Sequence, residues 1–138
     1  MSYAGDLPSR RAYEVLATEP DAVLIDVRTR AEWQYVGVPD LEPLGRHPVL
    51  IEWQRFPGGD INGAFLDELA DAGVTRERTL LFLCRSGARS RSAAIAATSA
   101  GYERSFNVSD GFEGPPDHQE RRGTISGWKH AGLPWRQS

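Results

Sequence analysis

The chain has very little cysteine, no long apolar run and no excess of positive charge. Its one cysteine in 138 residues, Cys84, has no partner for an internal disulfide, and structural zinc generally needs several Cys or His ligands at close spacing. No stretch approaches the roughly 18 apolar residues that a membrane-spanning helix needs. A net charge of −3 argues against non-specific nucleic-acid binding. We therefore expect a cytoplasmic protein that uses no nucleic acid, membrane, metal or cofactor.

What the chain does have is the composition of a globular protein, 40% hydrophobic and 25% charged. Its length suffices to bury a core without disulfides or metal. No internal repeat and no linker-like stretch divides it. We therefore expect a single domain over residues 1–138.

Short apolar runs alternate with segments of helical spacing, a pattern that predicts an α/β fold with a parallel, helix-covered sheet. The predicted strands are 22–27, 49–51, 79–83 and 105–108. Helices are predicted after Pro8, from the capping-box spacing of Thr29 to Glu32, from Asn62 as N-cap to Gly73, over 89–100, and over 128–135. The helix after Asn62 is expected to bury Phe65, Leu66 and Leu69.

Three segments rich in glycine, proline or polar residues are predicted to connect these elements. Residues 37–48 are expected to form a loop, and residues 53–60 a connection that turns at Pro57-Gly58-Gly59. Residues 111–127, which contain Pro115-Pro116, are expected to form an exposed loop.

The segment most informative about chemistry follows the strand at 79–83 and reads Cys84-Arg85-Ser86-Gly87-Ala88-Arg89-Ser90. A loop between a parallel strand and a helix is where open α/β sheets bind ligands, because its backbone N–H groups and the helix dipole converge there. Gly87 allows backbone angles that other residues resist, and Arg85 and Arg89 add positive charge. All of these features favour a thiolate over a thiol, so Cys84 is predicted to be a nucleophile inside an anion-binding loop.

A simpler interpretation stands beside this one, because a lone cysteine at the end of an apolar strand is often a small buried hydrophobe. Two arginines within five positions, next to a glycine-bearing turn into a helix, favour the functional interpretation.

The same segment resembles the active-site loop of single-domain rhodanese-like (thiosulfate sulfurtransferase) proteins. Ile25-Asp26-Val27-Arg28 with Glu32-Trp33 resembles that family's first-strand signature, and Gly127-Trp128 with Gly132-Leu133-Pro134 its C-terminal motif. The resemblance implies a parallel sheet of about five strands flanked by helices on both faces. It also implies sulfur transfer through a persulfide on Cys84, with the loop amides and nearby arginines holding an anionic donor.

The spacing from Cys84 to Arg89 distinguishes this reading from the cysteine phosphatases, which place five residues between the cysteine and the arginine that clamps a phosphoryl group. Here only four residues intervene, which suits a single terminal sulfur atom better than a phosphate ester. Phosphatase or arsenate reductase chemistry is therefore disfavoured.

Three further residues belong to the predicted site as supporting groups: Ser90, Asp26 and Arg28. For Asp26 and Arg28 the simpler interpretation is a structural ion pair. Two departures from the family pattern concern the surroundings of the loop: Gly37-Val38-Pro39-Asp40-Leu41 lacks the family's histidine, and the extended 111–127 loop replaces a compact Gly-Gly turn.

The sequence thus predicts a sulfurtransferase that takes sulfur from thiosulfate or a related sulfane donor and passes it to cyanide, a thiol or a protein acceptor. The alternative is a persulfide relay or anion-binding module that acts within a complex, with a sulfur-relay protein as its partner. The long 111–127 loop motivates that alternative as a docking surface.

Overall fold

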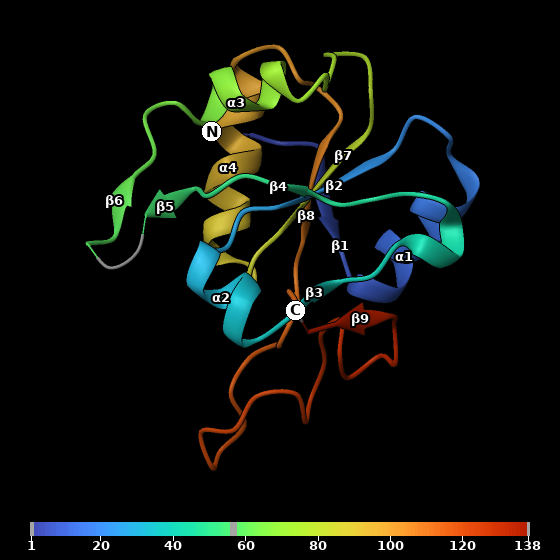
Figure 1. Cartoon of the computed structure of the whole chain (residues 1–138), viewed down its shortest axis with the longest axis vertical. Coiled ribbons are helices and arrows are strands. Elements are labelled where there is room, and N and C mark those ends of the chain that lie inside the picture. Colours follow the sequence, from blue (N-terminus) through green and yellow to red (C-terminus); the bar gives the residue numbers. More distant parts are fainter. Residues whose placement is uncertain (1, 56–57, 138) are drawn as a thin grey trace.

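A five-stranded parallel sheet forms the centre of the protein in a computed structural model that describes residues 2–55 and 58–137. The strand order is β1-β8-β7-β2-β4, and every neighbouring pair runs parallel (Figure 1). The strands are β1 (Gly5–Leu7), β2 (Val23–Asp26), β4 (Val49–Leu50), β7 (Leu80–Leu83) and β8 (Ser105–Val108). This confirms the predicted α/β class and the parallel sheet.

Helices cover both faces of the sheet, as expected. Helices α3 (Phe65–Asp71) and α4 (Ala88–Ser99) pack on one face, where Phe65 and Ala93 join a core with Phe82 of β7. Helix α1 (Ser9–Thr18) packs on the other, where Leu16 joins a second core with Leu81. The short helix α2 (Arg30–Tyr35) follows β2 and buries none of its residues.

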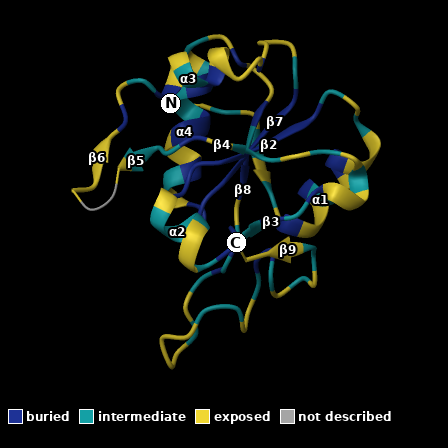
Figure 2. Ribbon diagram, in the orientation of Figure 1, coloured by how far each residue is buried: buried dark blue, intermediate teal, exposed yellow. Residues whose placement is uncertain are grey.

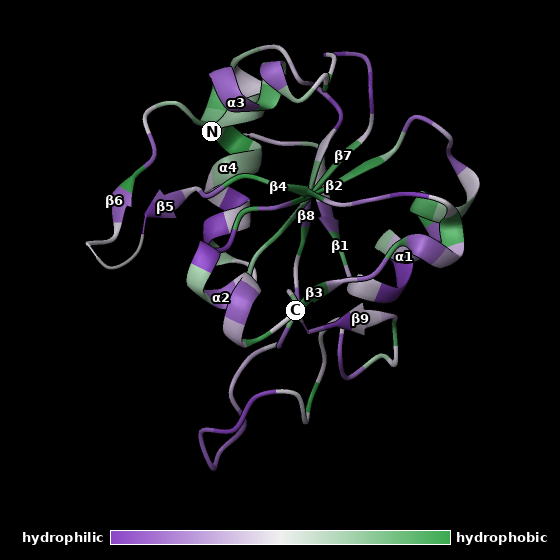
Figure 3. Cartoon of the chain, in the orientation of Figure 1, coloured by the Kyte–Doolittle hydropathy of each residue, from purple (hydrophilic) through white to green (hydrophobic). Residues whose placement is uncertain are grey.

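The central strands are the most apolar part of the chain. Every residue of β2 and of β7 is buried, which is the pattern of strands covered on both faces (Figures 2 and 3). Sequence therefore placed these strands well. The alanine-rich α4 lies against β8 and β7 because small side chains let a helix approach a sheet closely.

Local signals at helix starts had a mixed outcome. Pro8 precedes α1, and Thr29 and Glu32 form a complete capping box at the start of α2, as predicted. The prediction for α3 was wrong in two respects, because its N-cap is Ala64 and Leu66 is exposed. Asn62 instead accepts a hydrogen bond from the Ala64 N–H two residues on, and its own N–H₂ group donates to Glu52 O.

Five small elements were missed. Strand β1 pairs with β8 at the sheet edge, although its sequence Gly5-Asp6-Leu7 carries no apolar run. Within residues 37–48, predicted as loop, lie β3 (Val38–Pro39) and a 3₁₀ turn (Glu42–Leu44). Strands β5 (Gln54–Arg55) and β6 (Asp60–Ile61) form an antiparallel hairpin. Gly58 and Gly59 lie in its turn, whereas Pro57 falls outside the described residues.

The predicted helix over 128–135 is wrong. The segment forms turns and then β9 (Trp135–Arg136), which pairs antiparallel with β3. Trp128 is fully buried and its indole N–H donates to Pro134 O at 2.7 Å, so burial of one aromatic ring decides the path of the tail. Among the described residues, no helix has the length and apolar character to cross a membrane.

Candidate active site

The carboxyl ends of β2 and β7 bring the predicted site residues to one edge of the sheet. Asp26, the last residue of β2, lies opposite Leu83, the last residue of β7. Arg28 and Cys84 therefore follow the ends of two neighbouring strands. The Val27 N–H donates to Leu83 O at 2.8 Å, which extends the pairing to the residue before Cys84. In open α/β folds this edge is where ligands bind.

The loop after β7 turns at Gly87, which has a φ of 109° and immediately precedes α4. A side chain there would be strained at this φ, and its Cβ would also collide with the carbonyl oxygen of Ser109. The Gly87 N–H donates to Cys84 Sγ at 3.1 Å. The turn predicted from the sequence therefore directs a backbone donor at the sulfur, in front of the positive end of a 12-residue helix.

The Cys84 sulfur is buried, with only 1% of the residue exposed. The hydroxyl oxygen of Ser90, one turn into α4, lies 3.1 Å from Sγ and 2.6 Å from Asn107 Oδ1. Ser90 is fully buried, and its hydroxyl lies within hydrogen-bond distance of the sulfur. The Cys84 side chain also belongs to the core that contains Phe82. Cys84 is therefore buried, as the simpler interpretation expected, and its sulfur also faces the predicted anion-binding loop.

The two arginines of the loop differ in their surroundings. Arg85 is exposed, and its backbone carbonyl accepts from the N–H groups of Glu113 at 3.0 Å and Gly114 at 3.1 Å. Arg89 instead makes a two-pronged ion pair with Glu32, at 2.6 Å and 3.0 Å. Arg85 therefore has the side chain that is open to solvent, and Arg89 ties the loop to α2.

The Arg89–Glu32 ion pair also controls the charges of both groups. Burial works against the charged form of Glu32, but the hydrogen bonds and charge of Arg89 outweigh it and hold the pKa of this carboxyl below its usual range. Burial likewise opposes the charge of Arg89, and Glu32 more than compensates, so the pKa of the guanidinium is raised. Glu32 thus caps α2, as its spacing predicted, and pairs with an arginine 57 residues away.

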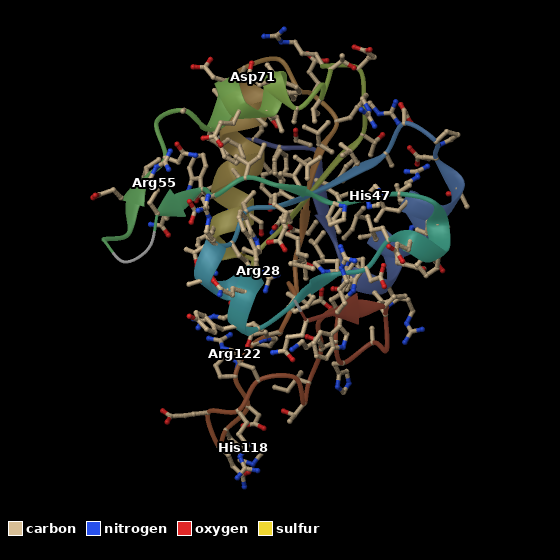
Figure 4. All side chains as sticks on the ribbon, in the orientation of Figure 1. Arg28, His47, Arg55, Asp71, His118 and Arg122 are labelled. Carbon is tan, nitrogen blue, oxygen red and sulfur yellow. The ribbon has the colours of Figure 1, made fainter. Side chains whose placement is uncertain are left out.

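Asp26 and Arg28 form an ion pair with no exposed side-chain surface (Figure 4 labels Arg28). The carboxylate accepts from Arg28 Nε at 2.9 Å and from Nη2 at 2.7 Å, and Nη2 also donates to Gly37 O. The guanidinium lies 4.2 Å from the centre of the Phe112 ring. Its remaining nitrogen, Nη1, has no hydrogen-bond partner among residues 2–55 and 58–137. The arrangement matches the structural interpretation of this pair.

The segment after β8 forms the wall behind the Cys84 loop, which the sequence did not predict. The Phe112 N–H donates to Cys84 O at 2.8 Å, and a Cβ on Gly111 would collide with Arg85 O. Gly111, Phe112 and Gly114 are buried, so the expectation of an exposed loop from 111 fails for its first residues. Backbone hydrogen bonds to the active-site loop hold them there.

Beyond Gly114 the loop does project outward, with His118 at its tip (Figures 1 and 4). The carboxylate of Asp117 organises it by accepting from the N–H groups of Gln119 and Arg121 and from the Thr124 hydroxyl. Those bonds, the Arg121 N–H foremost, lower the pKa of Asp117. The chain rejoins the core at Gly127, whose N–H donates to Asp110 Oδ2.

Sequence reasoning missed Asn107, which is nearly fully buried and accepts a hydrogen bond from Ser90. The signal that identifies it is positional: it lies near the end of the strand after α4, and that strand pairs with the strand of Cys84. A buried polar residue near the carboxyl end of a central parallel strand is a candidate site residue.

Comparison with known proteins agrees with the fold. The family model described as the STR4 middle domain matches residues 5–138. An uncharacterized protein of Rickettsia conorii is 40% identical over 93% of this chain and 94% of its own length. A protein of Allochromatium vinosum named sulfurtransferase is 28% identical over 94% and 92%. The crystal structure of Rv0390 from M. tuberculosis superposes with a TM-score of 0.90, at 50% identity over 99% of this chain and 100% of that one.

A five-stranded parallel sheet covered by helices on both faces is the fold of a rhodanese-like protein. The chain belongs to the STR4 middle-domain family, a rhodanese-like family.

Proposed function

We propose that this chain is a sulfurtransferase that moves sulfane sulfur from thiosulfate, or a related donor, to a thiophilic acceptor through a persulfide on Cys84. The Cys84 thiolate attacks the outer sulfur of thiosulfate, the S–S bond of the donor breaks, and sulfite leaves with the bonding electron pair. The resulting Cys84 persulfide anion gives its terminal sulfur to cyanide, a thiol or a protein, and the thiolate is regenerated. Each half-reaction conserves charge and needs no cofactor.

One observation carries this proposal: the Cys84 sulfur accepts the Gly87 N–H at the start of α4. A backbone donor and the positive end of a helix stabilise negative charge at that point, on the thiolate before transfer and on the persulfide after it. The exposed side chain of Arg85 adds positive charge that can attract an anionic donor. Arg89 pairs with Glu32, and its role in holding that donor stays a prediction.

The phosphatase alternative is weaker because the loop has four residues, not five, between Cys84 and Arg89. In addition, Arg89 directs two nitrogens at Glu32 and so is already engaged by a carboxylate. A phosphate clamp would have to break that ion pair. Hydrolysis of an aryl phosphate that vanishes in Cys84→Ser would reverse this judgement.

Mass spectrometry of the intact protein after incubation with thiosulfate tests the proposal. We expect one added sulfur, about 32 Da, that maps to Cys84 and disappears on reduction. Cyanide should then release thiocyanate. Cys84→Ser should do neither while remaining folded, and Ser92→Ala, on the exposed face of α4, is the matched control that should do both. An unmodified wild-type protein that forms no thiocyanate would refute the proposal.

A persulfide relay within a protein complex is the second candidate, and the 115–126 loop favours it. Cys84 is 1% exposed. The 115–126 loop near it projects from the protein and is held in shape by hydrogen bonds to Asp117. In this version a partner protein, such as a cysteine desulfurase, would deliver the sulfur. Asp117→Ala should then slow loading from that partner and leave loading by free thiosulfate unchanged. Loading from the partner at the wild-type rate in that variant would argue against the relay.

A further inference from the structure

A chain of side-chain hydrogen bonds leads from Cys84 across the sheet to β1. Ser90 Oγ contacts both Cys84 Sγ at 3.1 Å and Asn107 Oδ1 at 2.6 Å. Asn107 Nδ2 donates to Asp6 Oδ1 at 3.0 Å, and the Tyr3 hydroxyl donates to the same oxygen at 2.8 Å. Asp6 and Asn107 are register partners of the parallel pair β1–β8, so backbone pairing holds this contact in place.

Asp6 determines which way the Asn107 amide points. A carboxylate only accepts hydrogen bonds, so the amide must direct its N–H₂ group at Asp6 and its carbonyl oxygen at Ser90. The opposite orientation would place the Asn107 carbonyl oxygen against the Asp6 carboxylate, two acceptors without a hydrogen between them. Asn107 therefore presents Ser90 with an acceptor and never with a donor.

Ser90 has one hydroxyl hydrogen and two neighbours that can take it. At 2.6 Å from Asn107 Oδ1, which cannot donate, the Ser90 hydrogen must lie on that contact. The Ser90 oxygen then shows lone pairs to Cys84, an arrangement that suits a protonated sulfur, whose S–H can donate to it. A thiolate in the same place would face those lone pairs unless the hydrogen turned toward it.

We propose that Asn107, oriented by Asp6, is a positioning residue that keeps the Ser90 hydrogen away from Cys84 while the sulfur is protonated. When the sulfur loses its proton to solvent, the hydroxyl rotates and donates to the anion. Asn107 Oδ1 then loses its donor, and this loss opposes ionisation. Gly87 N–H favours the anion and Asn107 works against it, so their balance decides the fraction of reactive thiolate.

This inference deepens the proposed function, on which its role in sulfur transfer rests. In the persulfide the charge moves to the terminal sulfur, so the Ser90 hydrogen returns to Asn107. When an acceptor attacks that terminal sulfur, the S–S bond breaks and Sγ leaves as a thiolate. The Ser90 hydroxyl turns back to receive the charge at that moment.

Other charges near the sulfur are not altered by substitutions at Ser90 or Asn107. The charged groups on the elements around Cys84 are Asp26 and Arg28 after β2, Arg30 and Glu32 on α2, Arg85 in the loop, Arg89 and Arg91 on α4, Asp6 on β1 and Asp110 after β8. Four of these groups form two ion pairs, Asp26 with Arg28 and Glu32 with Arg89. A shift in these variants therefore reports hydrogen bonding to the sulfur and not a changed charge.

The test is the pH profile of thiolate formation, read from the ultraviolet absorbance of the thiolate. Cys84 is the one cysteine in the sequence, so the signal has a single source. Asn107→Leu removes the competing acceptor and should lower the midpoint by about 0.5–1 pH unit, because the hydrogen is then free for the anion. Ser90→Ala removes the donor and should raise it. Ser105→Ala, a buried hydroxyl on the same face of β8 that donates to Tyr102 O, should leave it unchanged.

The double variant Ser90→Ala/Asn107→Leu decides the mechanism. Since Asn107 acts through Ser90, its substitution should have no further effect once Ser90 is alanine. An equal downward shift in both backgrounds, or an Asn107→Leu midpoint at or above that of the wild type, would overturn the proposal. The profile needs no sulfur donor, so a chain that fails to load sulfur but shows these shifts refutes the proposed function alone.

Discussion

The buried ion pair of Asp26 and Arg28 yields the sharpest prediction about stability. Asp26→Leu removes the carboxylate that accepts from Nε and Nη2 and leaves a guanidinium with no exposed surface and no counter-charge. Breaking one partner of such a pair costs about 3–5 kcal/mol of the free energy of unfolding. Domains are typically stable by roughly 5–15 kcal/mol, so the variant should be close to the limit of folding.

Replacing both partners should cost less than replacing one. In Asp26→Leu/Arg28→Met no buried charge remains, and the methionine can still pack on the Phe112 ring that Arg28 covers. Both variants leave the Arg28 backbone N–H without its Asp26 acceptor, and the double variant adds the loss of the hydrogen bond to Gly37 O, about 1–3 kcal/mol. The double variant should therefore be more stable than Asp26→Leu alone.

Urea unfolding followed by tryptophan fluorescence measures these free energies, since Trp128 is buried in the fold and exposed on unfolding. Glu14→Gln is the matched control: its ion pair with Arg11 is more than half exposed and should contribute at most about 1 kcal/mol. A cost below about 1 kcal/mol for Asp26→Leu, or a double variant no more stable than the single one, would refute the reasoning. Full stability with lost sulfur transfer would instead make Asp26 a catalytic residue.

Three further predictions concern the loop and its ties. Glu32→Gln should lower the free energy of unfolding by about 1–2 kcal/mol at pH 7, measured by urea unfolding. Because pairing with Arg89 lowers the pKa of Glu32, its contribution is complete above the ordinary value of 4.5 and is lost as the pH falls through the lowered value, so wild type and variant should converge in acid. Gly87→Ala should lower the free energy of unfolding by about 1–3 kcal/mol through backbone strain, and further through the collision with Ser109 O. Gly45→Ala, at a φ of 70° with open space around it, should show the backbone strain alone. Equal losses in the two variants would contradict the collision. Arg89→Ala should raise the donor KM by the equivalent of about 1–3 kcal/mol in steady-state assays, and an unchanged KM would assign donor binding to the loop amides.

The features that sequence predicted correctly are those that depend on neighbouring residues. Thr29 and Glu32 cap α2 because the two side chains and backbone N–H groups involved lie within one turn. The strands at 23–26 and 80–83 were recognisable because burial on both faces requires unbroken apolar residues. The turn from Cys84 through Gly87 into α4 was predictable for the same reason, since its residues are contiguous.

The failures have the opposite cause. Strand β1 has no apolar pattern, and it forms because β8 offers an unpaired edge 101 residues later in the chain. The tail after Trp128 has helical spacing, but burial of that ring and the hydrogen bond to Pro134 O direct it into β9 instead. In both cases tertiary contacts outweigh a weak local preference.

The sequence by itself determined the glycine turn in front of α4, and it predicts Cys84 as the nucleophile and, from the spacing to Arg89, sulfur rather than phosphate as the cargo. Only the tertiary structure decided what surrounds the sulfur: Glu32 engages Arg89, Asn107 competes for the Ser90 hydrogen, and Phe112 closes the loop from behind. The physical reason is that hydrogen bonds and ion pairs depend on distance in space. Parallel strands bring to one edge residues that lie far apart along the chain.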